Sequence, residues 1–176
     1  MTENVLDADN QQGRLEKEIG NYIAGFVDGE GSFHIALQRN PSVKLGVQVV
    51  PEFHVSQNNP SKIVLDLIKD TLGCGYIKPN HRNNPSDQTL VFVVRSRSDL
   101  TEKVIPFFEK YKLRTQKKED FAKFAKILHL MSQEQHKTLS GIKNIVSIAY
   151  SMNQNGKFRK SKLAISKTLR DYTSES

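Results

Sequence analysis

Residues 22–33 constrain the fold of this chain most, because they join an apolar helical pattern to two acidic residues set among glycines. The stretch is YIAGFVDGEGSF. Apolar residues recur there with the spacing of one helical face, which predicts a helix over residues 19–27; they are Ile19, Tyr22, Ile23, Phe26 and Val27. Asp28 and Glu30 then fall at the carboxyl end of that helix, where the macrodipole disfavours negative charge. A divalent cation or a cationic partner beside this helix end would explain the two carboxylates.

The charge balance favours an anionic partner. The 176 residues include 26 Lys and Arg against 19 Asp and Glu, which gives a net charge of +7. A basic excess of this size is typical of proteins that bind nucleic acid or an anionic surface. Residues 110–118 and 157–170 are basic runs without an acid. Each run alone is equally compatible with a solvated face.

Cysteine content and hydropathy exclude several classes of protein. Cys74 is the only cysteine, which excludes a disulfide framework and a cysteine-based zinc site and indicates a reducing compartment. No apolar run approaches the roughly 20 residues that a membrane span requires. The first 13 residues are polar and acidic, unlike a secretory signal or an Arg-rich transit peptide. We therefore expect an intracellular protein that is neither secreted nor bound to a membrane.

The rest of the chain alternates between strand and helix patterns. We expect a flexible tail over residues 1–14, and strands over 32–39 and 47–57 joined by a turn at 40–42. Pro51 indicates a bulge or an edge position in the second strand. A helix should begin at Asn59-Pro60 and end at Gly73. Further strands are predicted over 75–78 and 90–97, and helices from Asp99, over 117–129, over 140–152 and over 161–172.

Residues 23–31, IAGFVDGEG, resemble the motif of the LAGLIDADG homing endonucleases. The motif occurs once, and single-motif members of that family act as homodimers. The resemblance extends in weaker form over residues 15–130 and implies the α+β fold of the family, in the order αββαββα. Its antiparallel, saddle-shaped sheet lies in the DNA major groove with the helices on one face, and C-terminal helices would follow. We expect an endonuclease domain over residues 15–152 and a basic C-terminal extension over 153–176.

The resemblance also implies the residues of an active site. Glu30 matches the acidic metal ligand, Gly29 the residue that offers its backbone carbonyl to the metal, and Asp28 an acid with a structural role. Gln57 matches a polar residue that positions solvent, and Lys117 a basic residue near the scissile phosphate, with Arg114 and Lys62 as competing candidates. The expected cofactor is Mg²⁺, for which Mn²⁺ substitutes, whereas Ca²⁺ should support binding without cleavage. Hard oxygen ligands suit this chemistry.

Two surfaces follow from the same comparison. The helix residues Tyr22, Ala24, Gly25 and Phe26 would form the dimer interface, where small residues let two backbones approach. The polar, outward side chains of the strands and their loops would contact DNA, as base-edge recognition requires; the candidates are Ser32, His34, Gln38, Gln48, His54, Lys78, Asn80, Arg82, Gln88 and Arg95. The basic segment beyond residue 157 is either a clamp on the DNA backbone or a solvated helix.

Three functional hypotheses remain open from the sequence. The first is a homodimeric, magnesium-dependent, site-specific endonuclease of a mobile intron, which cuts double-stranded DNA at a long pseudopalindrome and leaves 3′ overhangs. The second is an RNA maturase or a catalytically silent DNA-binding protein on the same fold; retention of both Asp28 and Glu30 favours the enzyme. The third is a structural α+β protein with a chance motif. The first would place the protein in an organelle or in prokaryotic cytoplasm.

Overall fold

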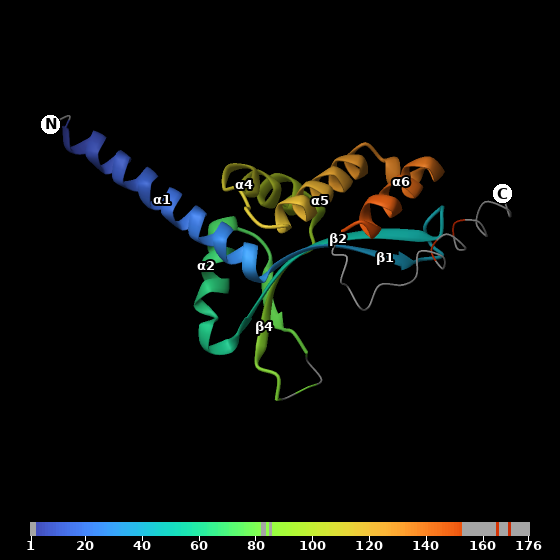
Figure 1. Ribbon diagram of the computed structural model, residues 1–176, viewed down its shortest axis with the longest axis horizontal. Coiled ribbons are helices and arrows are strands. Elements are labelled where there is room, and N and C mark those ends of the chain that lie inside the picture. Colours follow the sequence, from blue (N-terminus) through green and yellow to red (C-terminus); the bar gives the residue numbers. More distant parts are fainter. Residues whose placement is uncertain (1–2, 82–83, 85, 153–164, 166–168, 170–176) are drawn as a thin grey trace.

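The computed structural model describes residues 3–81, 84, 86–152, 165 and 169 (Figure 1). A long first helix leads directly into the first strand of a sheet, and two strand pairs are separated by a helix. The first half comprises α1 (Glu3–Glu30), β1 (Gly31–Arg39), β2 (Val47–Asn58), a 3₁₀ turn (Asn59–Ser61) and α2 (Ile63–Leu72). The second half comprises β3 (Tyr76–Pro79), β4 (Thr89–Val94), α3 (Arg97–Asp99), a π turn (Leu100–Val104), α4 (Ile105–Lys110), α5 (Lys117–Ser132), a 3₁₀ turn (Gln135–Lys137) and α6 (Leu139–Tyr150).

The four strands form one antiparallel sheet in the order β1-β2-β4-β3. Helices α4, α5 and α6 lie over one face of this sheet, and the opposite face carries no described helix (Figure 1). The expected α+β class, the αββαββα order of elements along the chain and the saddle-type sheet are therefore confirmed.

The covered face of the sheet holds an aromatic core that joins strands to helices. Phe33 of β1 is fully buried, and its ring centroid lies 5.0 Å from Phe53 of β2, 5.5 Å from Phe108 of α4 and 5.5 Å from Phe124 of α5. Aromatic pairs of this kind add about 0.5–1.5 kcal/mol each beyond the burial of their area. Phe33 lies three residues after Glu30, so this core fixes the position of the two acidic residues.

Glycine is required where α1 passes into β1. A Cβ on Gly31 would lie 2.5 Å from Cγ1 and 2.8 Å from the carbonyl oxygen of Val27. Real Cβ atoms do not approach other atoms so closely, and Val27 is itself fully buried. The last glycine of the motif therefore lets the strand start directly against the preceding helical turn, which leaves Glu30 at the junction.

Several predicted boundaries need correction. The helix α1 begins at Glu3, well before the predicted start at residue 19, because residues 3–14 contain good helix formers and no proline; the flexibility expected of residues 1–14 stays a prediction. The strand predicted to reach residue 97 ends at Val94, because the Ser96 hydroxyl caps the next helix by accepting a bond from the Asp99 N–H. Of the two alternatives predicted for Pro51, the edge position is confirmed and the bulge is not, because Pro51 pairs in continuous register with β1 alone.

The core continues past the expected domain boundary at residue 152. Ile165 and Leu169 are 2% and 3% exposed and belong to the same hydrophobic cluster as the sheet and helices. The remaining residues of the predicted 161–172 helix, with most of the basic segment after residue 157, lie outside the described residues. No helix in the described part of the chain is long and apolar enough to cross a membrane.

Candidate active site and nucleic-acid interface

Glu30 is the last residue of α1, and its carboxylate is exposed. The final turn of this helix contains no basic residue, so the helix itself does not offset the negative charge. Gly29 is also exposed, and the space where its side chain would lie is open. This junction is thus a carboxylate beside an accessible stretch of backbone, as the sequence predicted for a metal ligand and its neighbouring carbonyl.

Asp28 has a structural role in this arrangement. Its carboxylate accepts hydrogen bonds from the backbone N–H of Arg114 at 2.7 Å, the backbone N–H of Thr115 at 3.2 Å and the Thr115 hydroxyl at 2.8 Å. These bonds tie the end of α1 to the loop that precedes α5. Both oxygens are therefore engaged within the chain, which agrees with the expectation that Asp28 is not the metal ligand.

The loop that Asp28 holds brings one of the basic candidates to the acidic motif. The Lys117 Nζ donates a hydrogen bond to the carbonyl oxygen of Gly31 and lies 3.5 Å from that of Gly29. These two carbonyls flank Glu30, so the ammonium group lies at the motif. Arg114 meets the motif through its backbone, and its side chain is exposed. Lys62 instead binds both carboxylate oxygens of Asp66 at 2.6 Å.

Gln57 lies near the same end of the sheet. Gly31, the first residue of β1, pairs with Val55, and Gln57 follows that pair by two residues. Its side chain is half-buried, and its Oε1 accepts a hydrogen bond from the Asn58 N–H at 2.7 Å. The amide NH₂ group can still donate. Gln57 thus lies toward the α1 end of the sheet, and its role in positioning solvent stays a prediction.

The donors at the motif suit a hard cation, but one chain does not complete a site. Magnesium takes oxygen ligands and is commonly held by one or two carboxylates together with substrate phosphates. Glu30 and the Gly29 carbonyl are of this type. Among the described residues, no group of three or more His, Cys, Asp or Glu side chains could hold a metal ion. Further ligands would have to come from a second copy of the chain and from the substrate.

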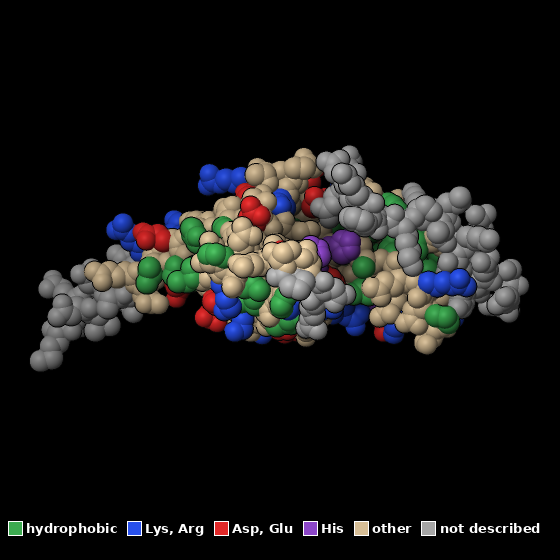
Figure 2. Space-filling view, turned by 90° about the horizontal axis from the view of Figure 1, so that it is seen from below, with side chains coloured by type: hydrophobic (Ala, Val, Ile, Leu, Met, Phe, Trp, Pro, Cys, Tyr) green, Lys and Arg blue, Asp and Glu red, His purple; other side chains and the backbone are tan. Residues whose placement is uncertain are grey.

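The open face of the sheet carries most of the predicted DNA contacts. The strand register places alternate residues there, and Figure 2 looks onto this face and shows histidine side chains near its middle. Cross-strand pairs on it join Ser32 to His54 and Gln38 to Gln48. The set comprises Ser32, His34, Gln38, Gln48, His54 and Lys78, with Arg95 immediately after β4. The predicted phase of β1 and β2 is thus confirmed.

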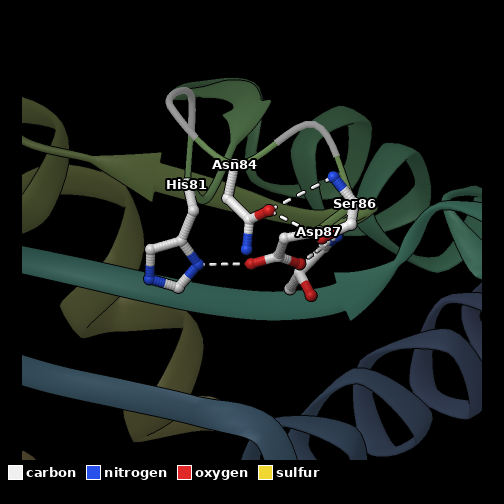
Figure 3. Close-up of polar contacts among 5 residues, drawn as sticks. His81, Asn84, Ser86 and Asp87 are labelled. Atoms are coloured by element: carbon white, nitrogen blue, oxygen red, sulfur yellow. Dashed lines mark hydrogen bonds and ion pairs between the residues drawn. The ribbon is translucent and has the colours of Figure 1, made fainter.

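The loop between β3 and β4 has its own polar network (Figure 3). Asp87 accepts a hydrogen bond from the Thr89 N–H at 2.8 Å and contacts His81 Nδ1, while the Asn84 side chain accepts from the backbone and hydroxyl of Ser86. Hydrogen bonds from Thr89, and then from His81, lower the pKa of Asp87 to about 2. The candidates Asn80 and Gln88 are exposed in this loop, and Arg82 lies outside the described residues.

Two features of this surface escaped the sequence analysis. The His81–Asp87 contact spans six residues of an irregular loop, and no spacing rule predicts it. The ion pair of Glu52 with Arg95 joins β2 to the residue after β4, and the same carboxylate contacts His54 within β2. The alternation already placed Glu52 outward, but only the register between β2 and β4 could have paired it with Arg95.

The side of α1 that faces away from the rest of the chain carries exposed apolar side chains and a small residue, which suit contact with a second helix. Leu15 and Tyr22 are 51% and 56% exposed, Phe26 is half-buried, and a Cβ on Gly25 would meet no atom within 4 Å. Ala24 is 4% exposed and faces this chain's own core, so it offers little surface to a partner. Of the four predicted interface residues, Tyr22, Gly25 and Phe26 are available for contact.

Comparison with known proteins agrees with this geometry. The sequence pattern described as LAGLIDADG endonuclease matches residues 23–128, which is more than half of the chain. The chain belongs to the LAGLIDADG endonuclease family. A relative named probable intron-encoded endonuclease 2, from Neurospora crassa, is 37% identical to this family member over 135 residues. The match covers 76% of the chain but only 29% of that relative, so the chain spans less than a third of its length.

Solved structures of LAGLIDADG proteins show the same fold. The homing endonuclease I-TnaI is 37% identical with a TM-score of 0.74, and the match covers 87% of this chain and 97% of that one. The archaeal intron-encoded homing endonuclease I-Vdi141I, solved in complex with DNA, is 30% identical with a TM-score of 0.78 and covers 88% of this chain and 96% of its own. One copy of this chain therefore matches nearly the whole length of each of these two solved chains.

Proposed function

We propose that the protein is a site-specific endonuclease that cuts double-stranded DNA as a homodimer. The observation that carries the proposal is the position of Glu30, exposed at the end of a helix whose last turn has no basic residue and whose other side carries exposed apolar residues. If two copies of α1 pack along that side, the two Glu30 carboxylates meet near the dimer axis. The open faces of the two sheets would then form one extended DNA-binding surface. Membership of the family supports this assembly.

The small size of Gly25 supports pairing through α1. No atom of the chain lies within 4 Å of where its Cβ would be, so a partner backbone can approach there. Exposed Leu15 and Tyr22 would be buried on the same helix. Burying apolar surface stabilises association by about 25 cal/mol per Å² removed from water. Pairing would also supply the second carboxylate that a single chain lacks.

The residues of the motif can divide the chemistry of phosphodiester hydrolysis among them. Glu30 and the Gly29 carbonyl would hold Mg²⁺, which supplies an activated water and neutralises charge on the phosphate. The Lys117 ammonium, beside Glu30, would stabilise negative charge that develops on the phosphate. The free amide N–H groups of Gln57 would orient the attacking water. Asp28 keeps the Lys117 loop in place.

The sheet supplies the recognition surface. Its open face carries hydroxyl, amide and imidazole groups that suit the base edges of the major groove. The net charge of +7 per chain supports contacts with phosphates, so binding should weaken steeply with salt. A symmetric pair of such faces favours a long pseudopalindrome as target, and cutting across the minor groove would leave 3′ overhangs. We further propose intron homing as its role, with the protein acting where the host DNA lies.

The proposal is tested by cleavage of intronless host-gene DNA. The full chain is incubated with a library of such genes in Mg²⁺, in Ca²⁺ and in EDTA. Discrete double-strand cuts in Mg²⁺ alone, with 3′ overhangs at a pseudopalindrome, are the expected result, and Mn²⁺ should also support cutting. Tight binding in Ca²⁺ without cutting in Mg²⁺ would overturn the nuclease assignment in favour of a DNA-binding protein or an RNA maturase.

A further inference from the structure

Glu52 is a buried carboxylate on the face of the sheet that the helices leave open. Its residue is 7% exposed, and no other charged side chain is buried among the residues that the structure describes. Glu52 pairs with His34 of β1, so its side chain lies on the open face of the sheet among the polar side chains. It is not part of the hydrophobic cluster.

A carboxylate in this position needs a reason. Burial of a charge costs free energy unless the group is paired, and negative charge on a DNA-binding face repels phosphates. Glu52 contacts two nitrogen groups, because Oε1 lies 2.5 Å from Arg95 Nε and Oε2 lies 2.9 Å from His54 Nε2. The carboxylate is therefore built into an ionic cluster on the open face.

The cluster leaves the outer end of Arg95 available. Glu52 contacts the Nε of Arg95, and the Arg95 side chain remains 49% exposed. The recorded contact is with the Nε edge of the guanidinium, and its two terminal amino groups carry further N–H donors. A planar pair of N–H donors matches the O6 and N7 acceptors of guanine in the major groove, and adenine presents an amino group at the first of these positions.

We propose that Arg95 reads a guanine base and that Glu52 is the positioning residue that fixes its guanidinium for this contact. The inference rests on the proposed function, since it requires the open face to lie in the major groove. Glu52 restricts the rotation of a long, flexible side chain, so less conformational entropy is lost when the base binds. It also neutralises part of the Arg95 charge, which reduces its attraction to phosphates in favour of a base edge.

The register locates the guanine within the half-site. Val55 pairs with Gly31 at the active-site end of β1. Glu52 lies three residues before Val55 in β2, away from that end. At about 3.3 Å per residue, the cluster is roughly 10 Å from the motif. We therefore expect one guanine in the inner part of each half-site, with its symmetry mate in the other half.

The test is a comparison of base preferences. The wild-type full chain selects sites from a randomised double-stranded DNA library in Ca²⁺, and Glu52→Gln, Arg95→Gln and Arg95→Lys are then profiled on the selected site with every base substituted. Wild type should prefer guanine at one inner position by about tenfold or more. Glu52→Gln and Arg95→Gln should lose that preference and keep the others, and Arg95→Lys should weaken it, because an ammonium lacks the planar pair of donors. Arg95→Lys keeps the charge on a half-exposed side chain, so its salt dependence should not change.

Controls separate positioning from folding and from general affinity. Glu134→Gln removes an exposed carboxylate paired with Lys137, outside the four strands, and should leave the whole profile unchanged. The inference is overturned if Glu52→Gln retains the guanine preference. It is also overturned if Arg95→Gln weakens all sequences equally with a shallower salt dependence, which identifies a phosphate contact. If wild type selects no site, the proposed function itself fails, whereas selection without an Arg95-dependent guanine refutes only this inference.

Discussion

Two acidic residues separated by one glycine have different surroundings in this protein. Asp28 accepts three hydrogen bonds from the loop before α5, while Glu30 is exposed at the end of the helix. The difference arises because α1 ends at Glu30 and only Asp28 faces residues 114 and 115. The structural acid and the proposed catalytic acid can therefore be separated by mutation.

Replacement of Asp28 by alanine should destabilise the fold. It leaves the Arg114 and Thr115 N–H groups without their acceptor, and such a loss costs about 1–3 kcal/mol. Asp28→Asn should cost less, because its amide oxygen can still accept one bond. Urea unfolding measures the effect, with Asp70→Ala on the exposed side of α2 as the matched control. Equal stabilities for Asp28→Ala and the control would contradict the structural role.

Stability should fall as pH decreases below about 6.5. Burial is the main cause that lowers the pKa of His54, against the opposing charge of Glu52 and with smaller contributions from His34 and Arg95. Burial, followed by Arg97 and Lys137, likewise lowers the pKa of His136. The unfolded chain then binds more protons than the folded chain in this window, so unfolding becomes easier in acid.

Urea midpoints at several pH values measure this dependence. We expect a lower midpoint at pH 5.5 than at pH 7.5 in the wild-type chain. The double variant His54→Gln/His136→Gln should show a flatter profile over the same range. A midpoint that rises in acid, or an unchanged slope in the double variant, would contradict the lowered pKa values of these two histidines.

At the scale of elements, the two sides of α1 differ in whether a glycine can be replaced by a larger residue. A Cβ on Gly20 would lie 2.3–2.5 Å from the ring atoms of Tyr111, which is 8% exposed, whereas a Cβ on Gly25 would meet nothing. The Gly20 side packs against this chain, and the Gly25 side is free. The helix therefore serves as both a core element and the proposed interface.

Gly20→Ala should destabilise the chain by about 1–3 kcal/mol, since the buried Tyr111 ring must move to admit the new methyl group. The matched control is Gly13→Ala on the same helix, where an added Cβ meets nothing within 4 Å. That change should stabilise the helix slightly, because alanine has the higher helix propensity. Thermal unfolding of both variants compares them directly, and equal shifts in Tm would refute the packing argument.

Gly25→Leu should leave each chain folded but prevent two copies of α1 from approaching. We expect a monomer by analytical ultracentrifugation, an unchanged far-ultraviolet circular dichroism spectrum, and loss of double-strand cleavage. Lys143→Leu, at an exposed position on α6, controls for added apolar surface. A Gly25→Leu variant that remains dimeric and active would show that α1 is not the interface.

The elements differ in how well sequence predicts them. The strands follow a period of two residues, so the phase of β1 and β2 and the buried Phe33 and Phe53 were predictable. The ends were not, because they depend on single contacts such as the Ser96 cap that ends the strand before residue 97. The helical state of residues 3–14 was missed because the segment lacks the apolar stripe on which helix prediction relies.

At the scale of the whole molecule, the site combines one local motif with contacts between distant segments. Asp28 and Glu30 were predictable because the helix, the acids and the glycines are contiguous. The choice between Arg114 and Lys117 was not, since it depends on how the loop before α5 folds against α1. The pairing of Glu52 with Arg95 required the register of strands more than 40 residues apart in sequence.

The most direct measurement is cleavage and binding by Glu30→Gln on the selected DNA site. This substitution removes the proposed metal-binding charge and little volume, so binding in Ca²⁺ should stay near the wild-type level while double-strand cutting in Mg²⁺ is abolished. Asp70→Asn, an exposed carboxylate on α2, should bind and cut like wild type. Retained cutting by Glu30→Gln would contradict the account, because the exposed acid at the end of α1 would then not be the residue on which hydrolysis depends.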